Sequence, residues 1–104
     1  MNARHFHTQR TAILKELEAM RTFEQNCLRG LLDCEHEFQQ TSADVNYRLT
    51  FQKTLKNAMT NTLSILFVKS LMVDKFMELS ELEKEQKKKR EDEQLLASEE
   101  EVDN

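Results

Sequence analysis

The near absence of proline and glycine most constrains what this chain can fold into. Its 104 residues include no Pro and a single Gly, at position 30. Tight turns between strands depend on glycine and proline, and proline also ends helices. The residues that favour helices, among them Leu, Glu, Lys, Gln, Met and Ala, are abundant instead. The sequence therefore predicts an all-α fold.

Residues 11–40 have the spacing of an amphipathic helix. Apolar residues recur at steps of three and four, and charged residues fill most positions between them. Glu24 occupies a position in this stripe where a leucine is expected. Gly30 lies mid-helix, and we expect a tolerated surface glycine, with a kink or a close-packed neighbour as the alternatives. The stripe consists of Ile13, Leu17, Met20, Cys27, Leu31, Cys34 and Phe38, widened by Phe23 and Leu28.

The segment from Thr41 to Met77 predicts a second helix that is apolar on two sides. A helix cannot bury two faces by itself, so we expect one face to pack on the first helix and the other to need a partner. The smaller, back face holds Phe67, Val68 and Leu71, and it is polar but uncharged between residues 50 and 64. The broad face, expected to meet the first helix, holds Phe51, Leu55, Ala58, Met59, Ile65, Leu66, Met72, Val73, Phe76 and Met77.

A capping signal separates the two predicted helices. Thr41 to Asp44 resembles a capping box, in which Thr41 is the N-cap of the second helix. A short turn there gives an antiparallel, coiled-coil-like helical hairpin over residues 1–94. Its helices are expected at about 3–40 and 42–94, followed by a disordered acidic tail over residues 95–104. One continuous helix is the alternative, because no Gly or Pro enforces the break.

A tight turn at this position also predicts a register for the hairpin. Residues whose numbers sum to about 85 would then lie opposite each other. Glu16 would lie near Lys69 and Glu24 near Thr62, so that each polar residue in a stripe meets a polar partner. Buried polar pairs of this kind set register in coiled coils.

The charges of the chain divide by segment. Residues 1–40 carry five basic and six acidic groups, residues 41–77 five and two, and residues 78–104 five and eleven, giving −1, +3 and −6. An acidic end of this kind repels phosphates, so general nucleic-acid binding is not expected. The run Lys87, Lys88, Lys89 and Arg90 has the composition of a nuclear localisation signal, but acidic neighbours favour a solvated helix of mixed charge.

No catalytic or metal-binding motif is recognisable in the sequence. Cys27 and Cys34 are seven residues apart, a spacing that favours two apolar core thiols over a zinc or redox site. His5 and His7 would point apart on a helix, and His36 is distant. We therefore expect neither enzyme activity nor a cofactor. The absence of a hydrophobic leader or a long apolar span predicts an intracellular protein, cytoplasmic or nuclear.

The two-sided second helix predicts a non-enzymatic interaction or scaffold subunit. It would form a homodimer or join a larger complex of helices, without a small-molecule substrate. A nucleic-acid-associated or nuclear factor that uses the run at residues 87–90 is the alternative, and a membrane-surface helix ranks last. The expected partner interface consists of Leu63, Leu66, Phe67, Val68, Leu71, Met72 and Phe76.

Overall fold

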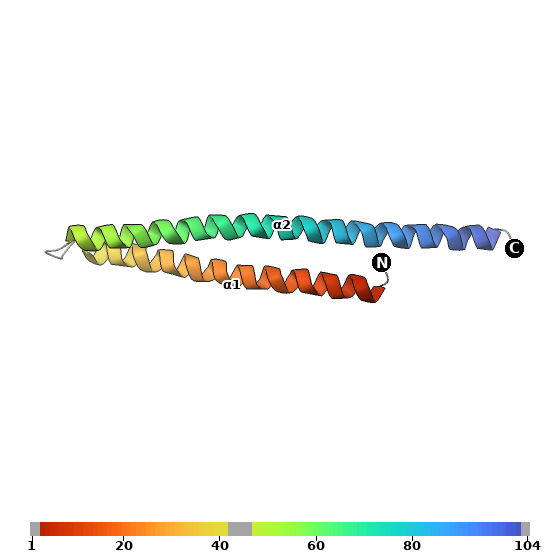
Figure 1. Ribbon diagram of the computed structural model, residues 1–104, viewed down its shortest axis with the longest axis horizontal. Helices are drawn as coiled ribbons and strands as arrows, with labels where there is room; N and C mark the ends of the chain where they lie inside the picture. The colour runs from red at the N-terminus through yellow and green to blue at the C-terminus, as the bar shows by residue number, and fades with distance from the viewer. Residues whose placement is uncertain (1–2, 42–46, 103–104) are drawn as a thin grey trace. The chain divides into compact units, whose positions relative to one another are not determined.

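The computed structural model of this chain describes residues 3–41 and 47–102. These residues form two helices, α1 over Ala3–Thr41 and α2 over Tyr47–Val102, and they contain no strand (Figure 1). The prediction of an all-α helical hairpin is confirmed. The continuous helix considered as the alternative is wrong, because α1 and α2 pack against each other in antiparallel order.

The bounds of the helices differ from the predicted ones near the turn and at the C-terminal end. Thr41 is the last residue of α1, so it is not the N-cap of α2, which begins at Tyr47. The remainder of the predicted capping box, residues 42–44, lies outside the described residues. The structure includes residues 95–102 in α2, a stretch of Leu, Ala and Glu that favours helix. The last two residues of the predicted tail, 103 and 104, lie outside the described part of the chain.

The helices pack in two units, which we describe separately. Unit 1 comprises Met1–Glu16 and Asp74–Asn104, and unit 2 comprises Leu17–Val73. In unit 2, near the end of α1 and the start of α2, the rings of Phe38 and Phe51 lie with their centroids 4.6 Å apart. Unit 1 joins the first turns of α1 to α2 through Ile13 and Leu82, both buried.

Within unit 2 the covered positions of both helices follow a heptad pattern, with steps of three and four residues as in a coiled coil. We call these positions the seam. On α1 the seam agrees with the predicted stripe. Its members there are Leu17, Met20, Glu24, Cys27, Leu31, Cys34 and Phe38, all buried or half-buried. On α2 the seam consists of Thr54, Ala58, Asn61, Ile65, Val68 and Met72.

The seam runs between the two faces that the sequence analysis distinguished, because Ala58, Ile65 and Met72 come from the broad face and Val68 comes from the back face. Thr54 and Val68 are only 2% and 4% exposed, whereas Phe51 and Met59 of the broad apolar face are 46% and 58% exposed. The prediction that the broad face packs on α1 is therefore correct for Ala58, Ile65 and Met72 and wrong for its more exposed members, such as Phe51 and Met59. Polar contacts contribute to the packing as well, because the buried Thr54 hydroxyl donates a hydrogen bond to Glu37 of α1.

The register also differs from the prediction. In unit 2, the residue numbers of the contacting pair Phe38 and Phe51 sum to 89, and those of the ion pair Glu24 and Lys69 sum to 93. In unit 1, Glu16 binds Lys75, and their residue numbers sum to 91. The predicted pairs Glu16 with Lys69 and Glu24 with Thr62 are thus replaced by these. The cause is the position of the turn: α2 begins at Tyr47 rather than near residue 42, which moves every opposite residue further along α2.

Candidate protein-interaction surface

The interior of unit 2 is polar near the turn. The Thr54 hydroxyl is buried and lies 2.9 Å from Glu37 Oε2 on α1 and 3.0 Å from the carbonyl oxygen of Thr50. Its single proton is donated to one of these two acceptors at a time. A threonine is stable at this buried position because both of its acceptor partners lie within hydrogen-bond distance.

A second polar contact lies further from the turn. Glu24 Oε2 and Lys69 Nζ are 2.7 Å apart, and the carboxylate side chain is 10% exposed while the lysine side chain is 58% exposed. Glu24 occupies the leucine-like position of the α1 stripe, and the lysine reaches it from the edge of the seam. The pair therefore joins a nearly buried anion to a cation that remains in contact with water.

Gly30 lies where α1 and α2 approach each other closely. A Cβ atom added at Gly30 would lie 2.7 Å from Asn61 Nδ2 and 2.9 Å from Asn61 Oδ1. Such separations are shorter than van der Waals contact, so the expected tolerated surface glycine is wrong and the close-packed neighbour is correct. Sequence reasoning missed Thr54, and it assigned Asn61 to the polar part of the back face without pairing it with Gly30. The seven-residue spacing of Thr54 and Asn61 to each other and to Val68 was the available signal, because it matches the seven residues between the cysteines of α1.

The exposed side of α2 in unit 2 carries a continuous line of large apolar side chains. They recur at every fourth position, and each step of four residues passes a full helical turn by about 40°, so the line winds slowly around α2. The middle of the line lies opposite the seam. We call these residues the ridge: Phe51, Leu55, Met59, Leu63, Phe67 and Leu71, which are 46, 47, 58, 64, 66 and 37% exposed.

The predicted partner interface is divided by the structure. Val68 and Met72 are buried within the chain, so they are not available to a partner. Leu63, Phe67 and Leu71 belong to the ridge. The other two predicted members, Leu66 and Phe76, are exposed as well. Five of the seven predicted residues are therefore exposed, and two of them, Leu66 and Phe76, also belong to the broad face.

The basic run lies on α2 in unit 1. Lys87, Lys88 and Arg90 are exposed, and Lys89 is half-buried. Successive helical residues point about 100° apart, so the four cations spread around the helix rather than forming one face. This arrangement does not present the single basic stripe that helix-based binding of nucleic acid uses.

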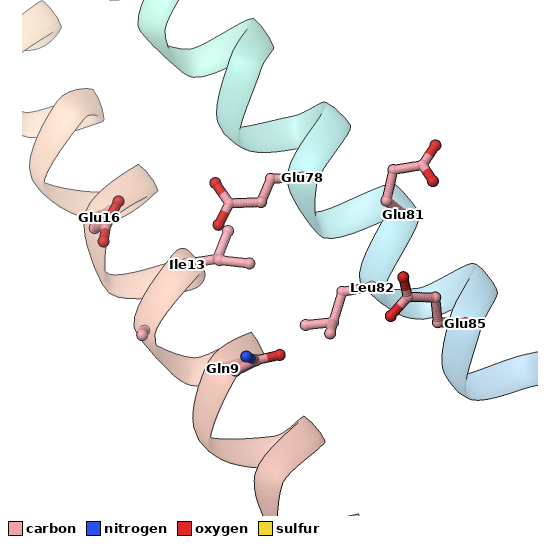
Figure 2. Close-up of a pocket in the computed structure, with 8 residues that line it drawn as sticks. Gln9, Ile13, Glu16, Glu78, Glu81, Leu82 and Glu85 are labelled. Carbon is pink, nitrogen blue, oxygen red and sulfur yellow. The ribbon is translucent and has the colours of Figure 1, made fainter. Parts of the chain in front are cut away.

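An acidic groove lies between α1 and α2 in unit 1. Figure 2 shows Ile13 and Leu82 pointing toward each other between the helices, with glutamate side chains around them. Lys75 binds two of these glutamates, Glu16 and Glu78. The Lys75 pKa is raised, first by the hydrogen bond to Glu16 and then by that to Glu78. The groove is thus partly neutralised by the chain itself. It is lined by Gln9, Ala12, Ile13, Glu16, Glu78, Glu81, Leu82 and Glu85.

The two cysteines are free and buried. Burial raises the pKa of the Cys34 thiol, and the nearby carboxylates of Glu37 and Asp33 add to the effect. A thiol of raised pKa is a poor nucleophile at neutral pH. Within residues 3–41 and 47–102, no cluster of three or more His, Cys, Asp or Glu side chains has the arrangement to bind a metal ion. Nor does either helix, over its described length, have an apolar stretch that could span a membrane.

Comparison of the chain with protein-family models, with curated proteins and with solved structures finds no match.

Proposed function

We propose that this chain is a non-enzymatic helical interaction subunit, which self-associates or assembles into a larger multi-protein complex through helix packing. The observation that carries the proposal is the ridge, six large exposed apolar side chains on α2 whose middle lies opposite the seam. Contiguous apolar patches on soluble proteins mark interaction sites more often than ordinary surface. The chain uses the seam to hold its own helices together and leaves the ridge for a partner.

The energy available from the ridge supports this role. Fully burying a Leu, Met or Phe side chain contributes about 1.5–3 kcal/mol. The ridge side chains are already about half covered, so each would contribute on the order of 1 kcal/mol and the six together about 6 kcal/mol. A partner that brings a similar surface doubles this sum, which then exceeds the lower estimates of the free-energy cost of association.

Light scattering of the purified protein tests the proposal. We expect a mass above that of the monomer, and we expect Phe67→Lys with Leu71→Lys to return the monomer mass. Both substituted residues lie outside the seam, so the helical signal in circular dichroism should stay close to that of the wild type. A wild-type chain that remains a folded monomer at every concentration would contradict the proposal.

Nucleic-acid association through the run at residues 87–90 is the alternative function. Three of its four cations are exposed. If it operates, replacing all four residues with Ala should reduce affinity for duplex DNA, and the wild-type affinity should fall steeply with salt. The spread of these cations around α2 makes this the weaker candidate.

A further inference from the structure

We propose that the middle of the ridge is covered by an acidic amphipathic helix of another protein, whose carboxylates bind Lys53 and Lys56. This inference rests on the proposed function and specifies the chemistry of the partner. The spacing of the exposed apolar side chains indicates a helix, and the charge beside them indicates an acidic one.

Four large apolar side chains of unit 2 point outward together from α2. Relative to Leu63, Met59 and Phe67 lie about 40° to either side. Leu66 lies about 60° from Leu63, on the side of Met59. The ends of the ridge point about 80° or more away from Leu63, so one partner helix does not cover them. We call the four central residues, each more than half exposed, the outward patch: Met59, Leu63, Leu66 and Phe67.

The outward patch has the width and the spacing of a helix-binding surface. Its members span about 100° around α2, which is the width of the apolar stripe that a helix buries against a neighbour. They follow each other at steps of four, three and one residues, as the residues of such a stripe do. A single partner helix can therefore contact all four side chains at once.

The charged residues of α2 in unit 2 have one sign. Residues 47–73 carry four basic residues and no acidic one. Lys69 is bound by Glu24 of α1. Lys53 and Lys56 are exposed, and neither has an ion-pair partner among the residues that the structure describes. Carboxylates beside the apolar stripe of a partner would complement these two cations, whereas a basic partner would be repelled.

The chain already joins its own helices with this chemistry. Glu24 interrupts the apolar stripe of α1, and Lys69 binds it from the edge of the seam. Lys56 has a comparable place beside the outward patch, because it points about 20° from Leu63 and lies about 10 Å nearer the start of α2. An apolar stripe that contains a carboxylate, as the stripe of α1 does, is therefore the expected feature of the partner helix.

The direction of Lys56 also favours a helix over a lipid surface. Helices that lie on membranes carry their Lys and Arg residues on the polar face, away from the apolar one. Lys56 points in nearly the same direction as Leu63, so a lipid layer that received Leu63 would also meet the ammonium group, at a cost in free energy. A protein helix can offer a carboxylate at this point instead.

Two synthetic peptides test the chemistry of the partner. Both are helices of roughly 20 residues with the same leucine stripe, and one carries glutamates beside the stripe where the other carries lysines. In fluorescence anisotropy at about 0.1 M salt, the chain should bind the glutamate peptide about tenfold more tightly than the lysine peptide. The difference should shrink at about 1 M salt. Equal affinities, a preference for the lysine peptide or binding of neither overturns the inference.

Charge reversal tests the position of the contact. The double variant Lys53→Glu with Lys56→Glu should prefer the lysine peptide. Arg21→Glu with Arg29→Glu is the matched control, because both arginines are exposed on α1 in unit 2 and the net charge changes by the same amount. The control should keep the preference of the wild type. Equal effects in the two double variants, or no effect in either, overturns the inference.

A neutral substitution tests the apolar part of the contact. Leu63→Gln should weaken binding of the glutamate peptide by roughly tenfold or more. Leu32→Gln is the control, because Leu32 is 65% exposed on α1 and Leu63 is 64% exposed on α2. The control should bind the peptide as the wild type does, and both variants should keep the helical signal in circular dichroism. Equal loss of binding in both variants overturns the inference.

Other occupants of the outward patch give different results. A mass above that of the monomer that the glutamate peptide does not lower assigns the patch to a second copy, which overturns the inference and leaves the interaction role intact. Binding to phosphatidylserine vesicles that is lost in Leu63→Gln assigns the patch to a lipid surface and also overturns the inference. A folded monomer that binds neither peptide overturns both the inference and the proposed function.

Discussion

The ion pair between Glu24 and Lys69 should respond asymmetrically to the loss of its two members. The Glu24 side chain is 10% exposed and the Lys69 side chain 58% exposed. Lys69→Met leaves a nearly buried carboxylate without its cation. Glu24→Leu removes that carboxylate and restores the expected apolar residue of the stripe, while the remaining lysine can turn toward water. We therefore expect Lys69→Met to be the more destabilising change.

The burial of the pair gives the size of each effect. Removing one member of a fully buried pair costs about 3–5 kcal/mol, and the exposure of the lysine reduces the expected cost of Lys69→Met to about 2 kcal/mol. Glu24→Leu loses an interaction worth about 1 kcal/mol or less and gains a similar amount from apolar burial. Its free energy of unfolding should therefore stay within about 1 kcal/mol of the wild type.

Urea unfolding followed by circular dichroism, at one fixed protein concentration and neutral pH, measures these free energies. The double variant should be more stable than Lys69→Met alone, because it no longer contains the unpaired carboxylate. A control cycle that combines Glu24→Leu with Lys53→Met should be additive, since Lys53 lies on α2 much nearer the turn. A silent Lys69→Met, or an additive cycle for Glu24 and Lys69, would refute the reasoning.

Three further predictions concern the seam and unit 1. The Cys34 thiol, whose pKa is raised mainly by burial, should react with a thiol reagent far more slowly in the native protein than in urea, and equal rates would contradict its burial. Thr54→Val should lower the free energy of unfolding by about 1 kcal/mol through loss of the bond to Glu37, and Thr54→Ser should retain most of that stability in the same urea assay. Binding to Glu16 raises the pKa of Lys75 above its unfolded value of 10.5, so its contribution is fully present below that pH and is lost as the pH rises through the folded pKa. The difference in thermal midpoint between the wild type and Lys75→Met should therefore be constant near neutral pH and shrink in strong alkali.

The helical hairpin could be predicted from the sequence because its causes are local. The lack of proline and glycine and the regular apolar stripe of α1 both act within a few turns of helix. Ile13, Leu17, Cys27 and Cys34, predicted as core, are buried in the structure. Such residues need no knowledge of their partner to be assigned to an inner face.

The choice of face on α2 could not be predicted from hydrophobicity alone. Leu63 and Phe67 are more apolar than Thr54 and Asn61, yet the latter two lie on the seam. What decides the packing is complementarity with α1, which places Glu37 beside Thr54 and Gly30 beside Asn61. At the seam, Thr54 donates a hydrogen bond to Glu37, and Asn61 fills the space beside Gly30. Large apolar side chains on the exposed side of α2 then indicate a surface for a partner rather than a face that packs within the chain.

The contact between Gly30 and Asn61 has a consequence for how this chain can change over evolutionary time. An alanine at position 30 would place its Cβ 2.7 Å from Asn61 Nδ2, so the end of the Asn61 side chain has to turn away before the methyl group fits. Shortening Asn61 to serine or alanine removes that requirement. A substitution at position 61 therefore lowers the cost of a later Gly30→Ala, and the two positions are coupled although they belong to different helices.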